Sequence, residues 1–152
     1  MFLWRISNHI DLSGKGGLVA SARWHSKGLP VVYLAESPSG ALLEHLVHLV
    51  RRNGRLPQTY SLLKISVPEN VMVCELGPLE MPGWTNTPEI TQRIGDEWLG
   101  GLETPLARVP SVIIRDTWNV LLNPLHPEVA EVGIVSATQE AFDTRLFRFG
   151  RG

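Results

Sequence analysis

Glu44 lies within Ala41 to Val50, a segment whose leucines and valines recur at helical spacing. A carboxylate beside a protein core normally needs hydrogen-bond or charged partners. Such a carboxylate can stabilise positive charge that develops on a substrate, or it can accept a hydrogen bond from a substrate hydroxyl. The pattern leaves two interpretations open, a functional site or a solvated helix face.

Two arginines each stand beside a tryptophan in segments that read as strands, Arg5 after Trp4 and Arg23 before Trp24. Because side chains alternate along a strand, one member of each pair faces the core and the other faces water or a cleft. An arginine in a cleft suits phosphate groups, since its planar guanidinium donates two parallel hydrogen bonds. Tyr33, in the run VVYLA, is expected to be a sheet or core residue whose hydroxyl finds a partner.

The familiar catalytic motifs are absent from the sequence. The glycines around Lys15 lack the spacing of a P-loop, and neither GxGxxG nor GxSxG is present. Glu44, His45 and His48 do not follow the order of the HExxH zinc motif, and no third ligand has a suggestive spacing. We therefore expect no metal site, and we expect both histidines to be partly exposed partners of Glu44 and Arg52.

The composition is that of one globular domain spanning 1–152, with 43% hydrophobic and 19% charged residues. A net charge of -1 argues against a protein whose main role is to bind a nucleic-acid backbone. No apolar run approaches the roughly 20 residues of a membrane-spanning helix, and the first residues lack the pattern of a signal peptide. Cys74, the lone cysteine, is expected to be a buried, inert thiol in an apolar strand. We expect a cytoplasmic protein that binds neither a membrane nor nucleic acid directly.

Two helices and many short strands must position these residues. Ser37 as N-cap and Pro38 as first helical residue predict a helix through Val50. Thr87 is the expected cap of a second helix, Pro88 to Leu99, which Gly100-Gly101 should end. A turn-rich loop is expected over 11–17. The expected strands are Phe2 to Ile6, Leu18 to Trp24, Val31 to Ala35, Tyr60 to Val67, Val71 to Leu76, Arg108 to Arg115, Glu131 to Ala137 and Leu146 to Phe149. Strands outnumber helices without regular alternation, which favours a mixed α+β domain.

Six short motifs stand in order along the chain. They are Trp4-Arg5, Ala22-Arg23-Trp24, Val32-Tyr33-Leu34-Ala35, Ala41-Leu42-Leu43-Glu44, Val109-Pro110-Ser111-Val112 and the segment NVLLNPLHP over 119–127. Taken in this order, they closely resemble the RES-domain toxins, a family named for an arginine, a glutamate and a serine. The resemblance runs from about Phe2 to His126 or beyond. Within its last part, Asn119 and Asn123 are expected to build turns beside Pro124.

The resemblance implies a fold like that of ADP-ribosylating toxins, in which a mixed sheet is split by a cleft that holds NAD. NAD would be the substrate, with no further cofactor, and the reaction would cleave its nicotinamide–ribose bond. Two alternatives remain, transfer of ADP-ribose to a protein target and a catalytically silent module that binds a partner. The implied partner is a Xre-like helix-turn-helix antitoxin, and a homodimer within the complex is left open.

The residue types suit this chemistry. Nicotinamide is a cationic leaving group, so cleavage mainly requires stabilisation of an oxocarbenium-like ribose, and Glu44 is the candidate carboxylate. Arg5 and Arg23 are the candidates for the pyrophosphate. Tyr33 is expected to stack on nicotinamide or bond a ribose, and Ser111 to hold a ribose or phosphate oxygen. The expected catalytic residues are thus Glu44, Arg5 and Ser111, with no need for Ser111 to act as a nucleophile.

Overall fold

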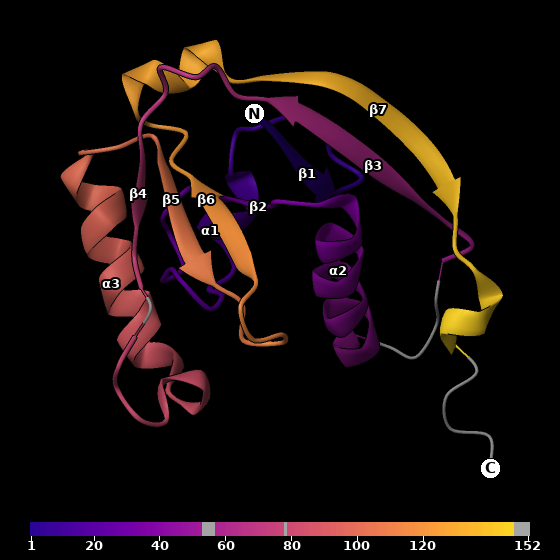
Figure 1. The fold of residues 1–152 in the computed structure, drawn as a ribbon, viewed down its shortest axis with the longest axis horizontal. Coiled ribbons are helices and arrows are strands. Elements are labelled where there is room, and N and C mark those ends of the chain that lie inside the picture. Colours follow the sequence, from indigo (N-terminus) through magenta and orange to yellow (C-terminus); the bar gives the residue numbers. More distant parts are fainter. Residues whose placement is uncertain (53–56, 78, 148–152) are drawn as a thin grey trace.

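A seven-stranded sheet forms the centre of the computed structural model, which describes residues 1–52, 57–77 and 79–147 (Figure 1). The strand order is β4-β5-β6-β2-β1-β3-β7. Among the described pairs, β4 and β5 run parallel and the others antiparallel, which confirms the expected mixed α+β class. The strands are β1 (Phe2–Ile6), β2 (Val32–Ala35), β3 (Thr59–Ser66), β4 (Val73–Glu75), β5 (Leu106–Pro110), β6 (Trp118–Leu122) and β7 (Gly133–Ala141).

The sheet is split between β1 and β2. These two strands share one residue pair, Trp4 with Ala35. By contrast, β1 pairs with β3 along its whole length, and β2 pairs with β6 from Val32 to Ala35. The strands β4, β5, β6 and β2 therefore form one half of the sheet, and β1, β3 and β7 form the other (Figure 1).

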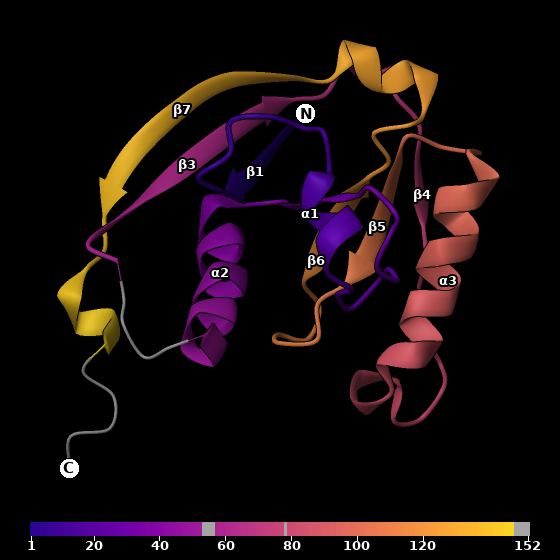
Figure 2. The ribbon, with the colours of Figure 1, turned by 180° about the vertical axis from the view of Figure 1, so that it is seen from behind.

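Helix α2 (Pro38–Arg52) packs against both strands at the split, β1 and β2. Its start is as predicted, because the Ser37 hydroxyl accepts a hydrogen bond from the Gly40 backbone N–H at 3.0 Å. Helix α3 (Pro88–Gly101) lies along the half of the sheet that contains β4, β5, β6 and β2, beside β4 and β5 (Figures 1 and 2). The short helix α1 (Lys15–Val19) is behind β6 in Figure 1 and in front of it in Figure 2. The described residues also form three short 3-10 helices, η1 (Trp84–Asn86), η2 (Pro127–Glu131) and η3 (Thr144–Phe147).

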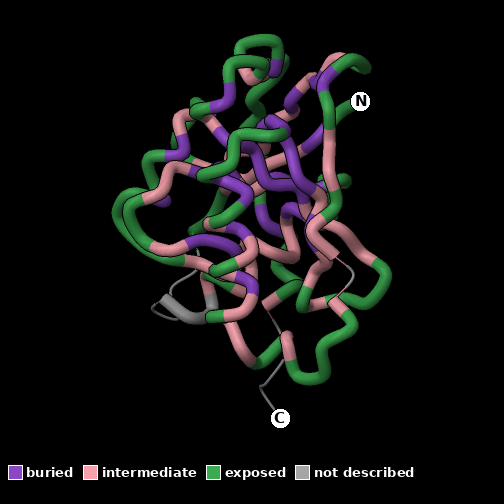
Figure 3. Tube along the Cα trace, turned by 90° about the vertical axis from the view of Figure 1, so that its left-hand side faces the viewer, coloured by how far each residue is buried: buried purple, intermediate pink, exposed green. Residues whose placement is uncertain are grey.

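Two apolar clusters hold the layers together, and their residues run along the middle of the molecule (Figure 3). One joins the two halves of the sheet across the split. The other packs α3 and the loop before β2 onto β5 and β6, with Cys74 half-buried at its margin on β4. Their buried members are Leu3, Val32, Leu34, Leu63, Ile65, Val67, Val71, Leu106, Val120, Leu122 and Val132 in the first, and Trp24, Val31, Trp98, Leu99, Ala107, Val109 and Leu121 in the second.

The segment before β2 differs from the prediction. Residues 18–24 were expected to form a strand, but α1 covers 15–19 and a loop follows, with one isolated bridge between Ala22 and His25. Close backbone packing explains the difference. Gly14 has a left-handed φ of 68°, and a Cβ at Gly17 would overlap the carbonyl oxygen of Leu29. Both constraints involve residues distant in the sequence.

Three further predictions about the elements were wrong. The strand expected over 108–115 ends at Pro110, and β6 was not predicted at all. Helix α3 continues through Gly100-Gly101, and Leu102, which has a φ of 51°, is its C-cap. The expected last strand is instead η3 up to Phe147, and its remaining residues lie outside the described part of the chain. Among the described residues, no helix is both long and apolar enough to cross a membrane.

We predict that Gly95→Ala destabilises the protein, because α3 passes so close to the loop before β2 that a Cβ there would overlap the carbonyl oxygen of Trp24. Overpacking against backbone costs about 1–3 kcal/mol of unfolding free energy, measured by urea denaturation. Gly100→Ala is the matched control in the same helix, because its Cβ would meet nothing within 4 Å. That control should stabilise by about 0.5–1 kcal/mol, and equal stability of the two variants would contradict the packing assigned to Gly95.

Candidate active site

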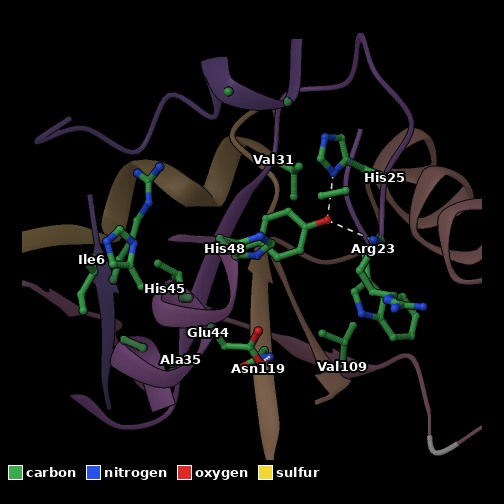
Figure 4. A pocket seen from close by; sticks show the side chains of 18 of the residues that line it. Ile6, Arg23, His25, Val31, Ala35, Glu44, His45, His48, Val109 and Asn119 are labelled. Carbon is green, nitrogen blue, oxygen red and sulfur yellow. Dashed lines mark hydrogen bonds between the residues drawn. The ribbon is translucent and has the colours of Figure 1, made fainter. Parts of the chain in front are cut away.

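A cavity of about 530 Å³ opens where the sheet splits (Figure 4). Its walls come from β1, from α1 and the loop that follows it, and from β2, α2, β5 and β6. Four of the five predicted site residues line it, Arg5, Arg23, Tyr33 and Glu44. The fifth, Ser111, reaches the cavity through its hydrogen bond to Glu44. The structure therefore brings together residues from five separate segments, β1, the loop after α1, β2, α2 and the connection after β5.

Glu44 projects from α2 toward β6, and its carboxylate lies beside Asn119 in Figure 4. Its Oε1 accepts a hydrogen bond from Asn119 Nδ2 at 2.7 Å and another from the Ser111 hydroxyl at 3.1 Å. The side chain is half-buried. The interpretation of Glu44 as part of a solvated helix face is therefore wrong, because the carboxylate faces the cavity with two donors fixed on one oxygen.

Ser111 is the first residue of the connection between β5 and β6. Its hydroxyl accepts a hydrogen bond from the Ile113 backbone N–H at 3.1 Å, and its own N–H donates to the Thr117 carbonyl at 2.8 Å. The same hydroxyl donates its hydrogen to Glu44. In this arrangement Ser111 orients the carboxylate.

Arg5 is half-buried on β1, across the split from β2. Its Nη1 donates to the Asp11 carbonyl oxygen at 3.0 Å. Burial lowers the pKa of the Arg5 guanidinium, and the nearby negative charge of Asp11 raises it in part. An arginine remains protonated at neutral pH even so, which leaves a partly desolvated cation at the cavity wall.

Arg23 lies in the loop between α1 and β2, so its predicted place in a strand is wrong. Its Nη1 donates to the Thr85 carbonyl oxygen at 2.9 Å, which fixes the guanidinium near η1. Arg23 and Arg5 come from opposite sides of the split, and both contribute to the cavity lining.

The Tyr33 hydroxyl belongs to a part-buried hydrogen-bond network with Trp24 and His25. It accepts a hydrogen bond from the Trp24 N–H at 3.0 Å and lies 2.8 Å from Nδ1 of His25, whose Nε2 lies 2.9 Å from the Ala20 carbonyl oxygen. Since a carbonyl only accepts, we assign the ring hydrogen to Nε2, and Nδ1 accepts from Tyr33. Burial lowers the pKa of His25, which favours this neutral form, and burial raises the pKa of Tyr33. The Tyr33 hydroxyl thus donates its hydrogen to Nδ1 of His25, and Tyr33 also lines the cavity.

Two histidines of α2, His45 and His48, also line the cavity. The His45 ring stacks on Phe142 with centroids 6.4 Å apart, and its pKa is lowered by burial and then by the charge of His48. His48 is exposed. The side chain of Arg52, the other expected partner, lies outside the described residues. In the described ranges, no group of three histidine, cysteine, aspartate or glutamate side chains is placed to hold a metal ion.

Asn119 was predicted to build a turn, and that prediction is wrong. It lies within β6, paired with Ala35 on one side and Val109 on the other, and its side chain reaches Glu44. Asn123 does build a turn, because its Oδ1 accepts from the Leu125 N–H at 3.1 Å. His25 was not predicted, because its partner Tyr33 lies eight residues further along the chain and no motif links the two.

Removing the Tyr33 hydroxyl should weaken the fold. In Tyr33→Phe the buried N–H of Trp24 and Nδ1 of His25 lose their partner, which we expect to lower the unfolding free energy by about 1–3 kcal/mol. Tyr60→Phe is the control, since that half-buried ring packs on Phe142 and is not among the residues that line the cavity, and its effect should stay within about 0.5 kcal/mol. A Tyr33→Phe protein as stable as the wild type in urea unfolding would disprove the network.

Comparison with known proteins gives consistent matches over nearly the whole chain. The family described as the RES domain matches residues 2–145. The protein named Toxin Res of Pseudomonas putida (strain KT2440) is 46% identical over 147 residues, which cover 97% of this chain and 100% of that protein. The Prs ADP-ribosylating toxin of Sphingobium sp. (strain YBL2) is 34% identical over 156 residues, covering 95% of this chain and 96% of the relative.

The fold is shared more widely than the sequence. A chain in the crystal structure of the M. tuberculosis MbcT–MbcA toxin–antitoxin complex superposes with a TM-score of 0.68 at 17% identity, over 92% of this chain and 84% of that one. This likeness supports the fold alone. The match over 2–145 and the two relatives above 30% identity decide the family. The chain belongs to the RES domain family of toxins.

Proposed function

We propose that this toxin binds NAD in the cavity at the split of the sheet and cleaves the bond between nicotinamide and ribose. The observation that carries the proposal is the carboxylate of Glu44, held at the cavity by Ser111 and Asn119. Family membership supports an activity of this kind, since one relative is named an ADP-ribosylating toxin.

The chemistry needs little covalent help from the protein. Nicotinamide leaves as a neutral molecule from a cationic ring, so the barrier lies in the positive charge that develops on the ribose. A fixed carboxylate lowers this barrier because it is already oriented before the charge appears. Glu44 forms no salt bridge with the described residues, and its two assigned donors are neutral. Its negative charge is therefore available to the substrate.

The remaining cavity residues suit the rest of NAD. Arg5 and Arg23, on opposite sides of the split, would hold the pyrophosphate, whose two phosphates carry the negative charge of the molecule. The Tyr33 ring would stack on nicotinamide, since its hydroxyl hydrogen is committed to His25. Ser111 would act mainly by orienting Glu44. NAD is a substrate in this proposal, and no separate cofactor is required.

Transfer of ADP-ribose to a protein is the second candidate, favoured by the name of the Sphingobium relative. The same residues would serve both reactions, which differ in the group that attacks the ribose. We propose an antitoxin of the Xre-like helix-turn-helix class as the partner, because the solved neighbour of this fold was crystallised as a toxin–antitoxin complex.

Incubation of the purified chain with NAD tests the proposal directly. We expect free nicotinamide to accumulate over many turnovers, and mass spectrometry of the other product to distinguish water, phosphate and protein as acceptors. The partner is checked in the same assay, because an antitoxin that covers the cleft stops nicotinamide release. A folded chain that binds NAD and releases no nicotinamide, with or without acceptors, would instead support a silent binding module.

A further inference from the structure

We propose that Asn119 is a positioning residue for NAD cleavage, whose amide fixes one oxygen of Glu44 so that the other remains directed to substrate. This inference rests on the proposed function. Asn119 Nδ2 donates to Glu44 Oε1 at 2.7 Å, the shorter of the two hydrogen bonds to that oxygen. No hydrogen bond from the described residues occupies Oε2 of Glu44.

The backbone of Asn119 is held far more rigidly than the side chain of Glu44. Asn119 pairs with Ala35 of β2 and with Val109 of β5, so a strand fixes it on each side. The residue that follows it, Val120, is 1% exposed. Glu44, by contrast, reaches the cavity through three rotatable bonds, and the last of these has a broad energy profile. A donor anchored in the sheet therefore determines where the carboxylate points.

The neutral amide is suited to this role. A lysine or arginine in its place would form an ion pair and cancel the charge that the ribose requires. The nearby cation of β5, Arg108, is already engaged by Glu36 and Glu75, each at 2.6 Å, and its guanidinium lies 4.6 Å from the Trp118 ring centroid. Glu44 is thus oriented by two neutral donors, Ser111 and Asn119.

The orientation is also shared between two elements. Ser111 approaches the same oxygen from the loop after β5, and its hydroxyl is held in turn by the Ile113 N–H. Two donors from separate elements fix the orientation of the Glu44 carboxylate more completely than one donor would. Loss of Asn119 should therefore reduce catalysis by misorienting Glu44, with little effect on the affinity for NAD.

A double-mutant cycle tests this coupling. We expect Asn119→Ala to lower kcat about tenfold while the Kd for NAD changes less than about twofold. In a Glu44→Gln background the same substitution should cost less than about twofold, because the charge that Asn119 orients has been removed. Asn70→Ala is the matched control, since Asn70 Nδ2 donates to Glu131 Oε2 at 2.9 Å on the surface, and it should leave kcat unchanged. Equal losses of kcat in both backgrounds, or a loss confined to Kd, would overturn the proposal.

A second readout does not depend on NAD cleavage. The bond to Glu44 should slow the exchange of the Asn119 side-chain amide hydrogens with water, and Glu44→Ala should accelerate that exchange several-fold, measured by NMR. Fast exchange in the wild type overturns the positioning role even if NAD is cleaved. Slowed exchange in a chain that does not cleave NAD refutes the proposed function and leaves the contact intact. If Asn119→Ala does not fold, the isosteric Asn119→Asp takes its place, because it replaces the amide donor with a second carboxylate. This variant should lower kcat by more than the tenfold expected for Asn119→Ala. Wild-type kcat in Asn119→Asp would also overturn the positioning role of Asn119.

Discussion

The near-absence of pairing between β1 and β2 is the constraint on which the site depends. One residue pair, Trp4 with Ala35, joins strands that are each fully paired on their other side. The sheet therefore stays continuous at one point and opens beyond it, with α2 packed against both strands. Arg5 on one side, Tyr33 on the other and Glu44 on the helix then face a common space.

A guanidinium and a carboxylate, from Arg5 and Glu44, line this one space. Arg5 is desolvated enough to lower its pKa, which makes its charge act over the cavity with less screening by water. Glu44 carries its negative charge on an oxygen fixed by Ser111 and Asn119. Behind them, His25 is neutral and serves to hold Tyr33. In the proposed function, Arg5 would hold the pyrophosphate of NAD and Glu44 would stabilise the positive charge on its ribose.

Local patterns in the sequence predicted β1, β2 and α2, because alternation, a serine cap and helical periodicity act over a few residues. They also singled out Glu44, Arg5 and Tyr33. Prediction failed where distant segments decide the structure. Helix α1 and its loop depend on glycines packed against remote backbone. Asn119 was wrongly predicted to build a turn. Its hydrogen-bond partner Glu44 is 75 residues away in the sequence, and no local pattern indicates that the two residues meet.

The most direct test of the account is the effect of Glu44→Gln on kcat, NAD affinity and melting temperature in one preparation. Glutamine keeps the shape and an oxygen that accepts from Ser111 and Asn119, and it removes the charge. We predict that kcat falls about 100-fold or more, because one preorganised electrostatic group has been lost. The Kd for NAD should change only a few-fold and the melting temperature should hold, since glutamine suits a helix about as well as glutamate. A folded Glu44→Gln protein with near-wild-type kcat would contradict the account.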